Sequence, residues 1–401
     1  MPDFKPDAIK PAWQLPFEGS WPMAVAFLGS HRRLAAANQE GTILVWDLPE
    51  SPEKGKIKDE QGKEVEGVVA PPPALRLEGH ANGVTHLVAS DDGKTLVSSS
   101  LDRTVRVWDL AAEPTGSGEV IVDKERRERA SKRVEKDKRQ AILEAPGAKV
   151  KTQQAAATLE GQRDWIQSLG RSFDGKRIIS GDDSGLAIVW DLAARKEVKR
   201  WQCSGVAWIL AAALSPDGQT AIVAQYRRKG GDYNNYPAHL RLYDVASGEM
   251  KLDILAVLYP KEKNPKYQYQ YEYHKFVAEG LVAASFSPDG KLIAVGQGGE
   301  GGDGKVHLIE AETGKVARAV SGHQYGVTDV AFTKDSKHLF TVGRDTTFRI
   351  IRVADGQEVA KIGKPRGGQF YDWLSALSLS PDEKWLAASD IGGFVQVWQL
   401  G

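Results

Sequence analysis

The sequence contains a single cysteine, Cys203, in 401 residues. One cysteine excludes a disulfide within the chain, and such scarcity fits a reducing compartment. The sequence also has no excess of either charge, because 53 Lys and Arg balance 53 Asp and Glu. The overall charge therefore gives no argument for a nucleic acid or an anionic membrane as a partner.

Long hydrophobic runs are missing as well. No stretch of 18 apolar residues is present, and the polar residues 1–7 do not resemble a signal peptide. We therefore expect a cytoplasmic protein that does not contact a membrane. The motifs His-Glu-x-x-His, Gly-x-Ser-x-Gly and paired Cys-x-x-Cys are also absent. We accordingly expect no catalytic residues, no bound metal and no cofactor.

One short motif resembles a nucleotide-binding sequence. Residues 296–301 read Gly-Gln-Gly-Gly-Glu-Gly and match the dinucleotide fingerprint. That fingerprint requires a helix immediately afterwards, because the phosphate binds at the helix N-terminus. The following residues, 305–309, instead have the pattern of a strand. We therefore expect no nucleotide site, and the carboxylates of Glu300 and Asp303 are too few for calcium.

The sequence does contain an internal repeat. Residues 43–48, 105–110 and 187–192 all end in Val-Trp-Asp-Leu. Short apolar runs precede each of these stretches and are separated by turn residues, a pattern that predicts strands rather than helices. Weaker copies of the same unit occupy residues 215–244, 287–309, 322–351 and 380–398. A unit repeated in this way determines the architecture of the whole chain.

The unit resembles the WD40 repeat, which forms one four-stranded blade of a β-propeller. Ile309, Ile351 and Trp398 occupy equivalent positions and are 42 and 47 residues apart, close to the ~40–45 residues of that repeat. The resemblance implies an all-β, seven-bladed propeller over residues 12–400, preceded by an N-terminal tail of residues 1–11.

The two ends of the chain predict how this ring closes. The sequence stops shortly after the third strand of the last repeat, so that blade lacks its outer strand. Residues 13–19 resemble the outer-strand segments 75–79 and 157–161. We expect the N-terminal strand to fill the vacant place, which would leave no unprotected sheet edge.

Five insertions lengthen the repeats. In a propeller, connections between the second and third strands lie on one face, here called the top, and those after the third strand lie on the bottom. Residues 49–73, 111–156 and 246–267 are expected on the bottom, and residues 226–238 and 297–304 on the top.

Two insertions have distinctive sequences. Residues 119–144 predict a helix with favourable i,i+4 charge pairs, and residues 124–139 are basic. This segment is either an arm that binds a partner, with nucleic acid as a weak possibility, or a solvated helix without one. The four tyrosines of residues 267–273 alternate, so they share one face of a strand. They either bind an extended partner or belong to an outer strand that packs on the next blade.

The resemblance also implies a structural role for some polar residues. In WD40 blades a His forms a hydrogen-bonded set with a Ser or Thr, an Asp and a Trp. His80, Ser98, Asp102 and Trp108 match this set in one repeat. In another repeat His323, Thr341 and Asp345 match, but Ile351 replaces Trp. The other repeats depart further, with Gln162 in place of His and Ser184 in place of Asp.

Aromatic residues recur just before the first strand of the repeats. This position holds Trp21, Gly83, Trp165, Trp208, Gly280, Gly326 and Trp373. It belongs to the top face near the central channel, so the indoles could form a binding surface. We include Tyr325, Phe370 and Tyr371 as neighbours, with Arg227 and Arg228 at the rim to attract an acidic partner. The alternative is that these tryptophans only pack within the repeats.

These observations favour a non-catalytic scaffold that binds a peptide or another protein on its top face. We expect a monomer that does not bind nucleic acid. Two alternatives stay open, namely an enzyme or small-ligand binder that uses the central channel and a sensing domain of a larger assembly. Because one fold supports many functions, the resemblance alone does not choose among them.

Overall fold

The computed structural model describes residues 4–17, 20–58, 64–203, 207–226, 238–260, 276, 280–320, 322–364 and 373–401. Within these ranges the regular structure is mostly β-strand with few helices, as the sequence predicted. Most strands pair antiparallel with a neighbour in the sequence, because short turns join them.

The strands form sheets that follow one another along the chain. The first sheet contains β2 (Pro22–Leu28), β3 (Ser30–Asn38), β4 (Ile43–Asp47) and β7 (Leu75–Glu78), and the second contains β8 (Val84–Ala89), β9 (Thr95–Ser100), β10 (Val105–Asp109) and β13 (Ala157–Leu159). The third sheet contains β14 (Ile166–Arg171), β15 (Arg177–Asp182), β16 (Leu186–Asp191) and β17 (Lys196–Gln202). The fourth contains β18 (Trp208–Leu214), β19 (Thr220–Tyr226), β20 (His239–Asp244) and β21 (Met250–Asp253).

The remaining strands continue this pattern. They are β22 (Leu281–Phe286), β23 (Leu292–Asp303), β24 (Val306–Glu310) and β25 (Val316–Val320); β26 (Gln324–Phe332), β27 (His338–Gly343), β28 (Phe348–Arg352) and β29 (Glu358–Ile362); and β30 (Leu374–Leu379), β31 (Trp385–Asp390) and β32 (Phe394–Gln399) with β1 (Lys10–Pro16). Two bridges between β23 and β26 connect neighbouring groups of strands.

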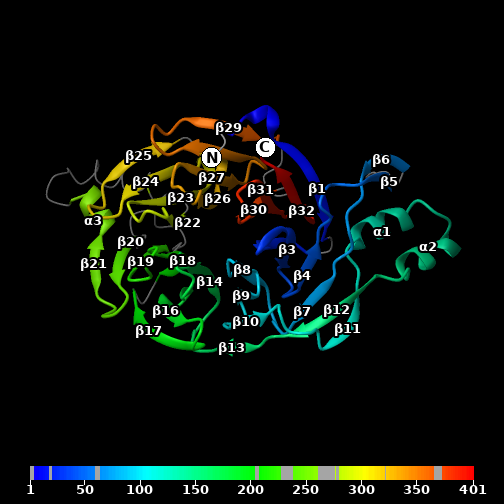
Figure 1. Cartoon of the computed structure of the whole chain (residues 1–401), viewed down its shortest axis with the longest axis horizontal. Coiled ribbons are helices and arrows are strands. Elements are labelled where there is room, and N and C mark those ends of the chain that lie inside the picture. Colours follow the sequence, from blue (N-terminus) through cyan, green and yellow to red (C-terminus); the bar gives the residue numbers. More distant parts are fainter. Residues whose placement is uncertain are drawn as a thin grey trace.

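The sheets are arranged around a common centre (Figure 1). Their first strands contact one another in the order β2, β8, β14, β18, β22, β26, β30 and back to β2. Side-chain hydroxyls also link neighbouring sheets at this centre. Thr85 donates to the Ile166 carbonyl at 2.9 Å, and Ser375 donates to the Pro22 carbonyl at 2.7 Å.

The hydrophobic core lies between neighbouring sheets. One cluster joins Val105 and Val107 of β10 to Ile178 of β15 and Trp190 of β16, all of them buried. The other clusters likewise draw residues from two adjacent sheets. Because both faces of each sheet are covered in this way, several strands read as continuous apolar runs rather than as alternating ones.

The N-terminal strand pairs with the last strand of the chain. β1 runs antiparallel to β32, with Gln14 opposite Gln396, and the two lie side by side in Figure 1. Its side chains Trp13 and Leu15 are buried. The assignment of residues 1–11 as an N-terminal tail stays a prediction, and the described part of that segment contacts the rest of the chain. Phe4 is buried against Phe340, with ring centroids 5.2 Å apart.

The insertion of residues 111–156 differs from the single helix expected over residues 119–144. It contains β11 (Gly116–Val120), two short helices α1 (Lys124–Ser131) and α2 (Lys136–Leu143), and β12 (Ala148–Gln154). β12 pairs parallel with β7 and antiparallel with β11, so it extends the first sheet outward. Of the expected helix, only residues 119–120 pair as a strand, in β11, whereas β12 begins after residue 144.

The other insertions contain strands of their own. Residues 49–73 include a hairpin of β5 (Lys54–Lys58) and β6 (Glu64–Val68). Residues 246–267 include β21 and the short helix α3 (Ile254–Leu258), and β21 is the strand that pairs with β20. The tyrosine segment 267–273 lies outside the described residues. Residues 227–237 also lie outside, and residues 297–303 form the end of β23.

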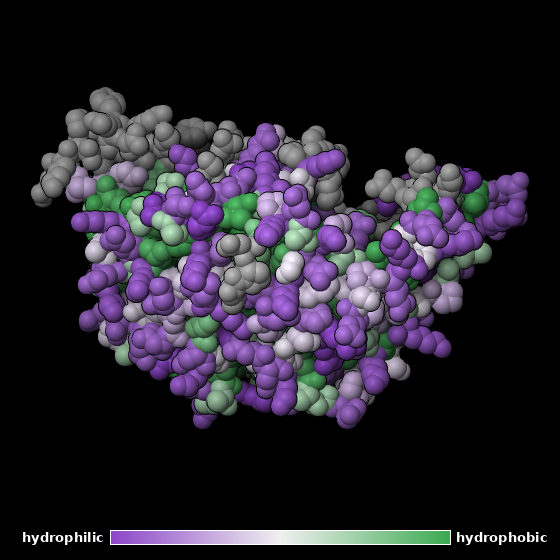
Figure 2. All heavy atoms as spheres, turned by 45° about the horizontal axis from the view of Figure 1, so that its top comes forward, coloured by the Kyte–Doolittle hydropathy of each residue, from purple (hydrophilic) through white to green (hydrophobic). Residues whose placement is uncertain are grey.

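The visible surface is mostly hydrophilic, with hydrophobic residues scattered over it (Figure 2). An arm projects on the right of that view, where Figure 1 places α1, α2, β5 and β6. Among the helices of the described ranges, none combines the length and the apolar character needed to cross a membrane.

Candidate functional site

The position that carries the four tryptophans is the same structural position in each repeat. The backbone carbonyl before the first strand accepts a hydrogen bond of 2.8–3.0 Å from the N–H that follows the second strand. The acceptors are Trp21, Gly83, Trp165, Gly280, Gly326 and Trp373, and their donors are Gln39, Leu101, Asp183, Gly298, Arg344 and Ile391. Trp208 lies opposite Tyr226 in the corresponding place. These residues therefore lie at the same edge of their respective sheets.

Three of the indoles are open to solvent. Trp21 and Trp165 are each 50% exposed, and Trp208 is 39% exposed. Trp165 and Trp208 precede or begin β14 and β18, which are neighbouring first strands. An exposed indole is an unusual use of a large apolar side chain, whereas Trp46 and Trp108 of the repeat motif are fully buried. The exposure argues against packing as the main role of Trp21, Trp165 and Trp208.

The remaining aromatic candidates are either half-buried or outside the described residues. Trp373 is half-buried, and the Arg344 guanidinium carbon lies 4.3 Å from the centroid of its ring, a cation–π distance. Tyr325 is half-buried with φ +69°, a left-handed conformation that is rare for a bulky residue. Phe370, Tyr371, Arg227 and Arg228 lie outside the described residues.

Two carboxylates lie close to Trp165. Asp164 accepts a hydrogen bond of 2.9 Å from the Trp165 N–H and is exposed. Asp183 is half-buried, and its Oδ2 accepts a hydrogen bond of 3.1 Å from Gln167. Burial, assisted by the charges of Asp164 and Asp182, raises the pKa of Asp183 to about 6 although the Gln167 hydrogen bond opposes the shift. A basic side chain placed here would relieve this repulsion.

The structure brings the four polar residues of the second repeat together. His80 Nδ1 lies 2.8 Å from Asp102 Oδ2, and His80 Nε2 lies 2.7 Å from Ser98 Oγ. The Trp108 indole N–H donates to the same hydroxyl at 2.9 Å. Burial lowers the pKa of His80 even though Asp102 opposes the shift. The ring is therefore neutral at neutral pH, and its partners assign the proton to Nδ1.

The repeat with His323 has a shorter version of this set. His323 Nδ1 lies 2.8 Å from Asp345 Oδ1, and Nε2 lies 2.8 Å from Thr341 Oγ1. Ile351 stands where the indole would be and is buried. The two sets lie within their sheets and are almost completely buried, so they join strands and do not face a ligand.

A third hydrogen-bonded set was not predicted from the sequence. Gln162 Nε2 donates to Ser180 Oγ at 2.7 Å, and Trp190 Nε1 donates to the same oxygen at 2.8 Å. Asp182 supplies the carboxylate, because its Oδ2 accepts from the Arg163 N–H at 2.8 Å. The amide of Gln162 thus takes the place of the imidazole. The carboxylate comes from Asp182, two residues before Ser184, which occupies the position of the acid in the repeat pattern. The signal was the pairing of Ser180 with Trp190 at the spacing of Ser98 and Trp108.

Among the described residues, no group of three or more His, Cys, Asp or Glu side chains could hold a metal ion. The stretch that matches the dinucleotide fingerprint lies in β23 and is followed by the strand β24. Cys203 is half-buried, and burial raises the pKa of its thiol to about 12. Such a thiol is not a nucleophile at neutral pH.

With this geometry established, comparison with known proteins defines the class. The family described as "WD domain, G-beta repeat" matches residues 72–109, 153–191, 314–352 and 367–399. Each match covers the first three strands of one sheet, and the first three matches also include a strand of the sheet before it. The chain therefore contains WD40 repeats at these four places.

Curated relatives share parts of the sequence. The chain is 22% identical over 336 residues to Autophagy-related protein 16 of Arabidopsis thaliana, which covers 84% of this chain and 51% of the relative. It is 34% identical over 82 residues to Small ribosomal subunit protein RACK1 of Drosophila melanogaster, and 30% identical over 77 residues to Target of rapamycin complex subunit LST8 of Saccharomyces cerevisiae. These shorter matches cover 20% and 19% of this chain, and 21% of each relative. The chain thus spans about half of the plant relative and about a fifth of the others.

Proposed function

We propose that the chain is a seven-bladed WD40 propeller, closed by its N-terminal strand, that acts as a non-catalytic scaffold for another protein. The cyclic contacts of the first strands and the pairing of β1 with β32 support the closed ring. The names of two relatives assign them to a target of rapamycin complex and to the small ribosomal subunit. Both names describe components of larger assemblies, in agreement with a scaffold.

The partner binds at the top face, and the observation that carries this proposal is the exposure of Trp21, Trp165 and Trp208. Exposed indoles provide large, rigid contact areas, which is why Trp is enriched at binding hot spots. Their equivalent positions place them at one edge of the sheets, where a peptide or protein segment can contact more than one. The left-handed backbone of Tyr325 at the same edge adds a strained residue of the kind that gathers at ligand sites.

The test compares the intact protein with two variants in affinity capture followed by mass spectrometry. Trp21→Ala with Trp208→Ala removes two exposed indoles. Phe173→Ala is the matched control, because Phe173 is 46% exposed but lies in the turn after β14, at the opposite edge. We expect partners captured by the wild type and by Phe173→Ala to be lost from the double variant, while all three melt at similar temperatures. Equal capture by the double variant would refute the top-face site.

A further inference from the structure

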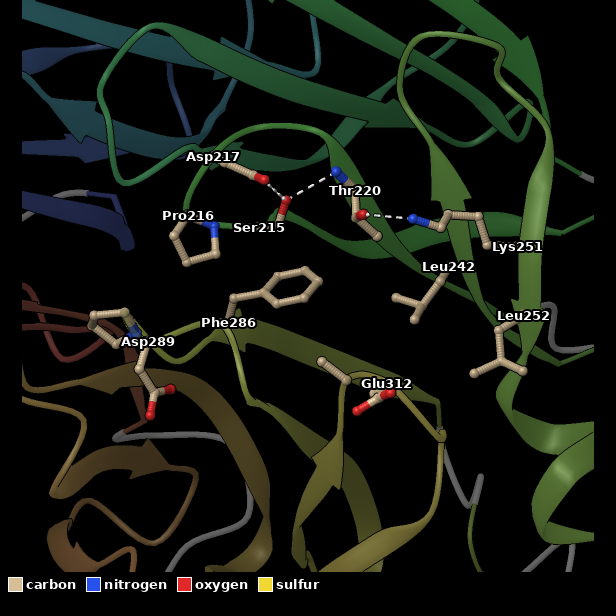
Figure 3. Close-up of a pocket in the computed structure, with 13 residues that line it drawn as sticks. Ser215, Pro216, Asp217, Thr220, Leu242, Lys251, Leu252, Phe286, Asp289 and Glu312 are labelled. Carbon is tan, nitrogen blue, oxygen red and sulfur yellow. Dashed lines mark hydrogen bonds between the residues drawn. The ribbon is translucent and has the colours of Figure 1, made fainter.

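A groove of about 590 Å³ lies between two neighbouring sheets. It lies at the end of the strands opposite to the exposed tryptophans. Its walls come from the sheet of β18–β21 and from the sheet of β22–β25 (Figure 3). The turns after β18 and β22 line it, together with the turn after β24. Because successive antiparallel strands run in opposite directions, these turns lie at the sheet edge opposite Trp208. The groove is open to solvent and belongs to the bottom face.

The floor of the groove is apolar and firmly held. Phe286 and Leu242 lie in its middle in Figure 3 and are almost fully buried, at 7% and 4% exposure. Both belong to the core cluster between these two sheets, with Leu252 and Ala311 packed against it. A side chain that enters the groove therefore meets a preformed apolar surface, which lowers the entropic cost of binding.

The rim of the groove is acidic. Asp217, Asp289 and Glu312 line it, and all three are exposed. Among the described residues, neither Asp217 nor Glu312 has an ion-pair partner. Asp289 has a distant one, since Lys291 Nζ lies 3.9 Å from its Oδ2.

Local hydrogen bonds fix the two aspartates. Ser215 Oγ donates to Asp217 Oδ1 at 2.6 Å, and Ser287 Oγ donates to Asp289 Oδ1 at 2.7 Å. The Ser215 hydroxyl lowers the pKa of Asp217. Partial burial opposes the shift at Asp289, but the Ser287 hydroxyl and backbone N–H groups outweigh it and lower the pKa there as well. Both side chains are therefore ionised at neutral pH and held in place before a partner arrives.

Lys251 is the cation in the groove wall. Its Nζ donates to Thr220 Oγ1 at 3.3 Å, which holds it against the β19 side of the groove (Figure 3). The carboxylates of Asp217, Asp289 and Glu312 remain exposed to solvent. A ligand with positive charge on both sides of an apolar group would match the two walls and the floor together.

We propose that this groove binds a peptide segment of another protein that presents one large apolar side chain between lysine or arginine residues. The apolar side chain packs on Phe286 and Leu242, and the flanking cations pair with Asp217 and Glu312. An extended chain suits the site better than a compact ligand, because the carboxylates lie on opposite walls of an open groove. The site is independent of the indoles on the top face and adds a second contact surface to the scaffold.

The experiment measures fluorescence anisotropy of labelled octapeptides with the intact protein. The probes carry a central Leu, Phe or Trp between Lys or Arg residues. One control set replaces the basic residues by Glu, and another replaces the apolar residue by Ala. We expect binding of at least one basic probe that weakens as salt is raised, with neither control set binding comparably. Absence of binding by every basic probe, or a preference for the Glu set, would overturn the proposal.

Matched variants locate the binding. Asp217→Asn with Glu312→Gln keeps the shapes of the side chains and removes two charges, and we expect the Kd to rise at least tenfold. Asp92→Asn is the control, because Asp92 accepts the same Ser hydrogen bond, at 2.6 Å, in the equivalent turn after β8, outside the groove. We expect it to change the Kd less than twofold. An equal effect of both variants would place the peptide elsewhere and overturn the proposal.

Two further measurements separate this site from other possibilities. Trp21→Ala with Trp208→Ala should leave the peptide affinity unchanged, so failure of the top-face proposal and failure of this one are distinguishable. Sedimentation of the wild type and of Asp217→Asn with Glu312→Gln then tests a second copy as the occupant. A concentration-dependent dimer that disappears in the variant would show self-association through the groove and overturn the proposal of a foreign peptide.

Discussion

The indole of Trp13 stacks on the indole of Trp385, with ring centroids 5.3 Å apart and 28° between the ring planes. Trp13 lies on β1 and Trp385 begins β31, so the contact joins the two ends of the chain. His31 of β3 also stacks on Trp385, at 5.2 Å and 9°. The first strand, the first sheet and the last sheet thus meet at one aromatic cluster, which makes the N-terminal segment part of the core.

Deleting residues 1–19 should therefore destabilise the protein strongly. The deletion removes the buried side chains of Phe4, Trp13 and Leu15 and exposes the edge of β32. We expect a loss of several kcal/mol, since one buried Trp→Ala change alone costs about 3–5 kcal/mol. Urea or thermal unfolding of the two proteins provides the measurement. Identical melting temperatures would show that the N-terminal strand does not close the ring.

Two single variants serve as a control for this prediction. Trp13 is 2% exposed and Trp21 is 50% exposed, although both belong to the N-terminal segment. We expect Trp13→Ala to cost about 3–5 kcal/mol and Trp21→Ala less than about 1 kcal/mol. Similar losses from both would mean that Trp21 contributes to packing, against its proposed role in binding.

The charged part of the long insertion should be dispensable for folding. Residues 121–147 connect β11 and β12, which end opposite each other with Val120 paired to Ala148. Replacing these residues by Asn-Gly closes the same hairpin with a two-residue turn. We expect a strand-like circular dichroism spectrum and a change in stability below about 1 kcal/mol.

Replacing all of residues 111–156 should have a different effect. That change also removes β12, whose pairing with β7 and whose buried Val150 hold the insertion to the first sheet. Exchanging the whole insertion for a short turn should therefore cost more stability than exchanging residues 121–147 alone. If both replacements melt like the wild type, β12 adds nothing to stability.

Removal of the Ser98 hydroxyl should cost more than removal of the Thr341 hydroxyl. Ser98→Ala leaves the Trp108 indole N–H and His80 Nε2 without their partner, whereas Thr341→Val affects His323 Nε2 and spares an indole. Because each buried polar group left unpaired costs about 1–3 kcal/mol, the expected losses are about 2–6 kcal/mol for Ser98→Ala and about 1–3 kcal/mol for Thr341→Val. Denaturant unfolding of the two variants tests the order, and a larger loss for Thr341→Val contradicts it.

His307 should give the protein a measurable dependence on pH. Its ring is 6% exposed and lies 4.3 Å from the Phe276 ring, and neither nitrogen has a hydrogen-bond partner within the described part of the chain. Burial, with a smaller effect from the Lys305 charge, lowers the pKa of His307 to about 4. The unfolded state, with a pKa of about 6.5, then binds the proton more readily. The stabilising effect of the neutral, buried His307 ring is therefore fully present above pH 6.5 and is lost as the pH falls toward 4.

The variant His307→Phe isolates this effect. We expect it to be more stable than the wild type by about 1–2 kcal/mol at pH 7, because it removes unpaired buried nitrogens while keeping a ring of similar shape. The difference should grow as the pH is lowered from 6.5 to 4.5. Asp329 opposes this trend in both proteins, since burial raises its pKa to about 6, so the comparison must be between variants. A difference that stays constant with pH would refute the assignment.

Much of the fold could be predicted from the sequence because it is a local, repeated signal. The Val-Trp-Asp-Leu endings and the turn residues between them determined the strands and their order. The likeness of residues 13–19 to the outer-strand segments predicted that a strand forms there, and β1 does pair with β32. The spacing of Ser98 from Trp108 also recurs at Ser180 and Trp190, where it marks a hydrogen-bonded set.

The remaining features depend on neighbours that are distant in the sequence. β12 is a strand because β7 offers it an edge, although the adjacent residues favour a helix. Gln162 replaces a histidine because its amide reaches Ser180. The exposure of Trp21, Trp165 and Trp208 and the groove over Phe286 depend on which sheets lie side by side. The sequence by itself determined the strands and their repeat, because these follow from local patterns. Only the tertiary structure decided which side chains are buried and which surfaces stay open, because burial is set by packing between sheets.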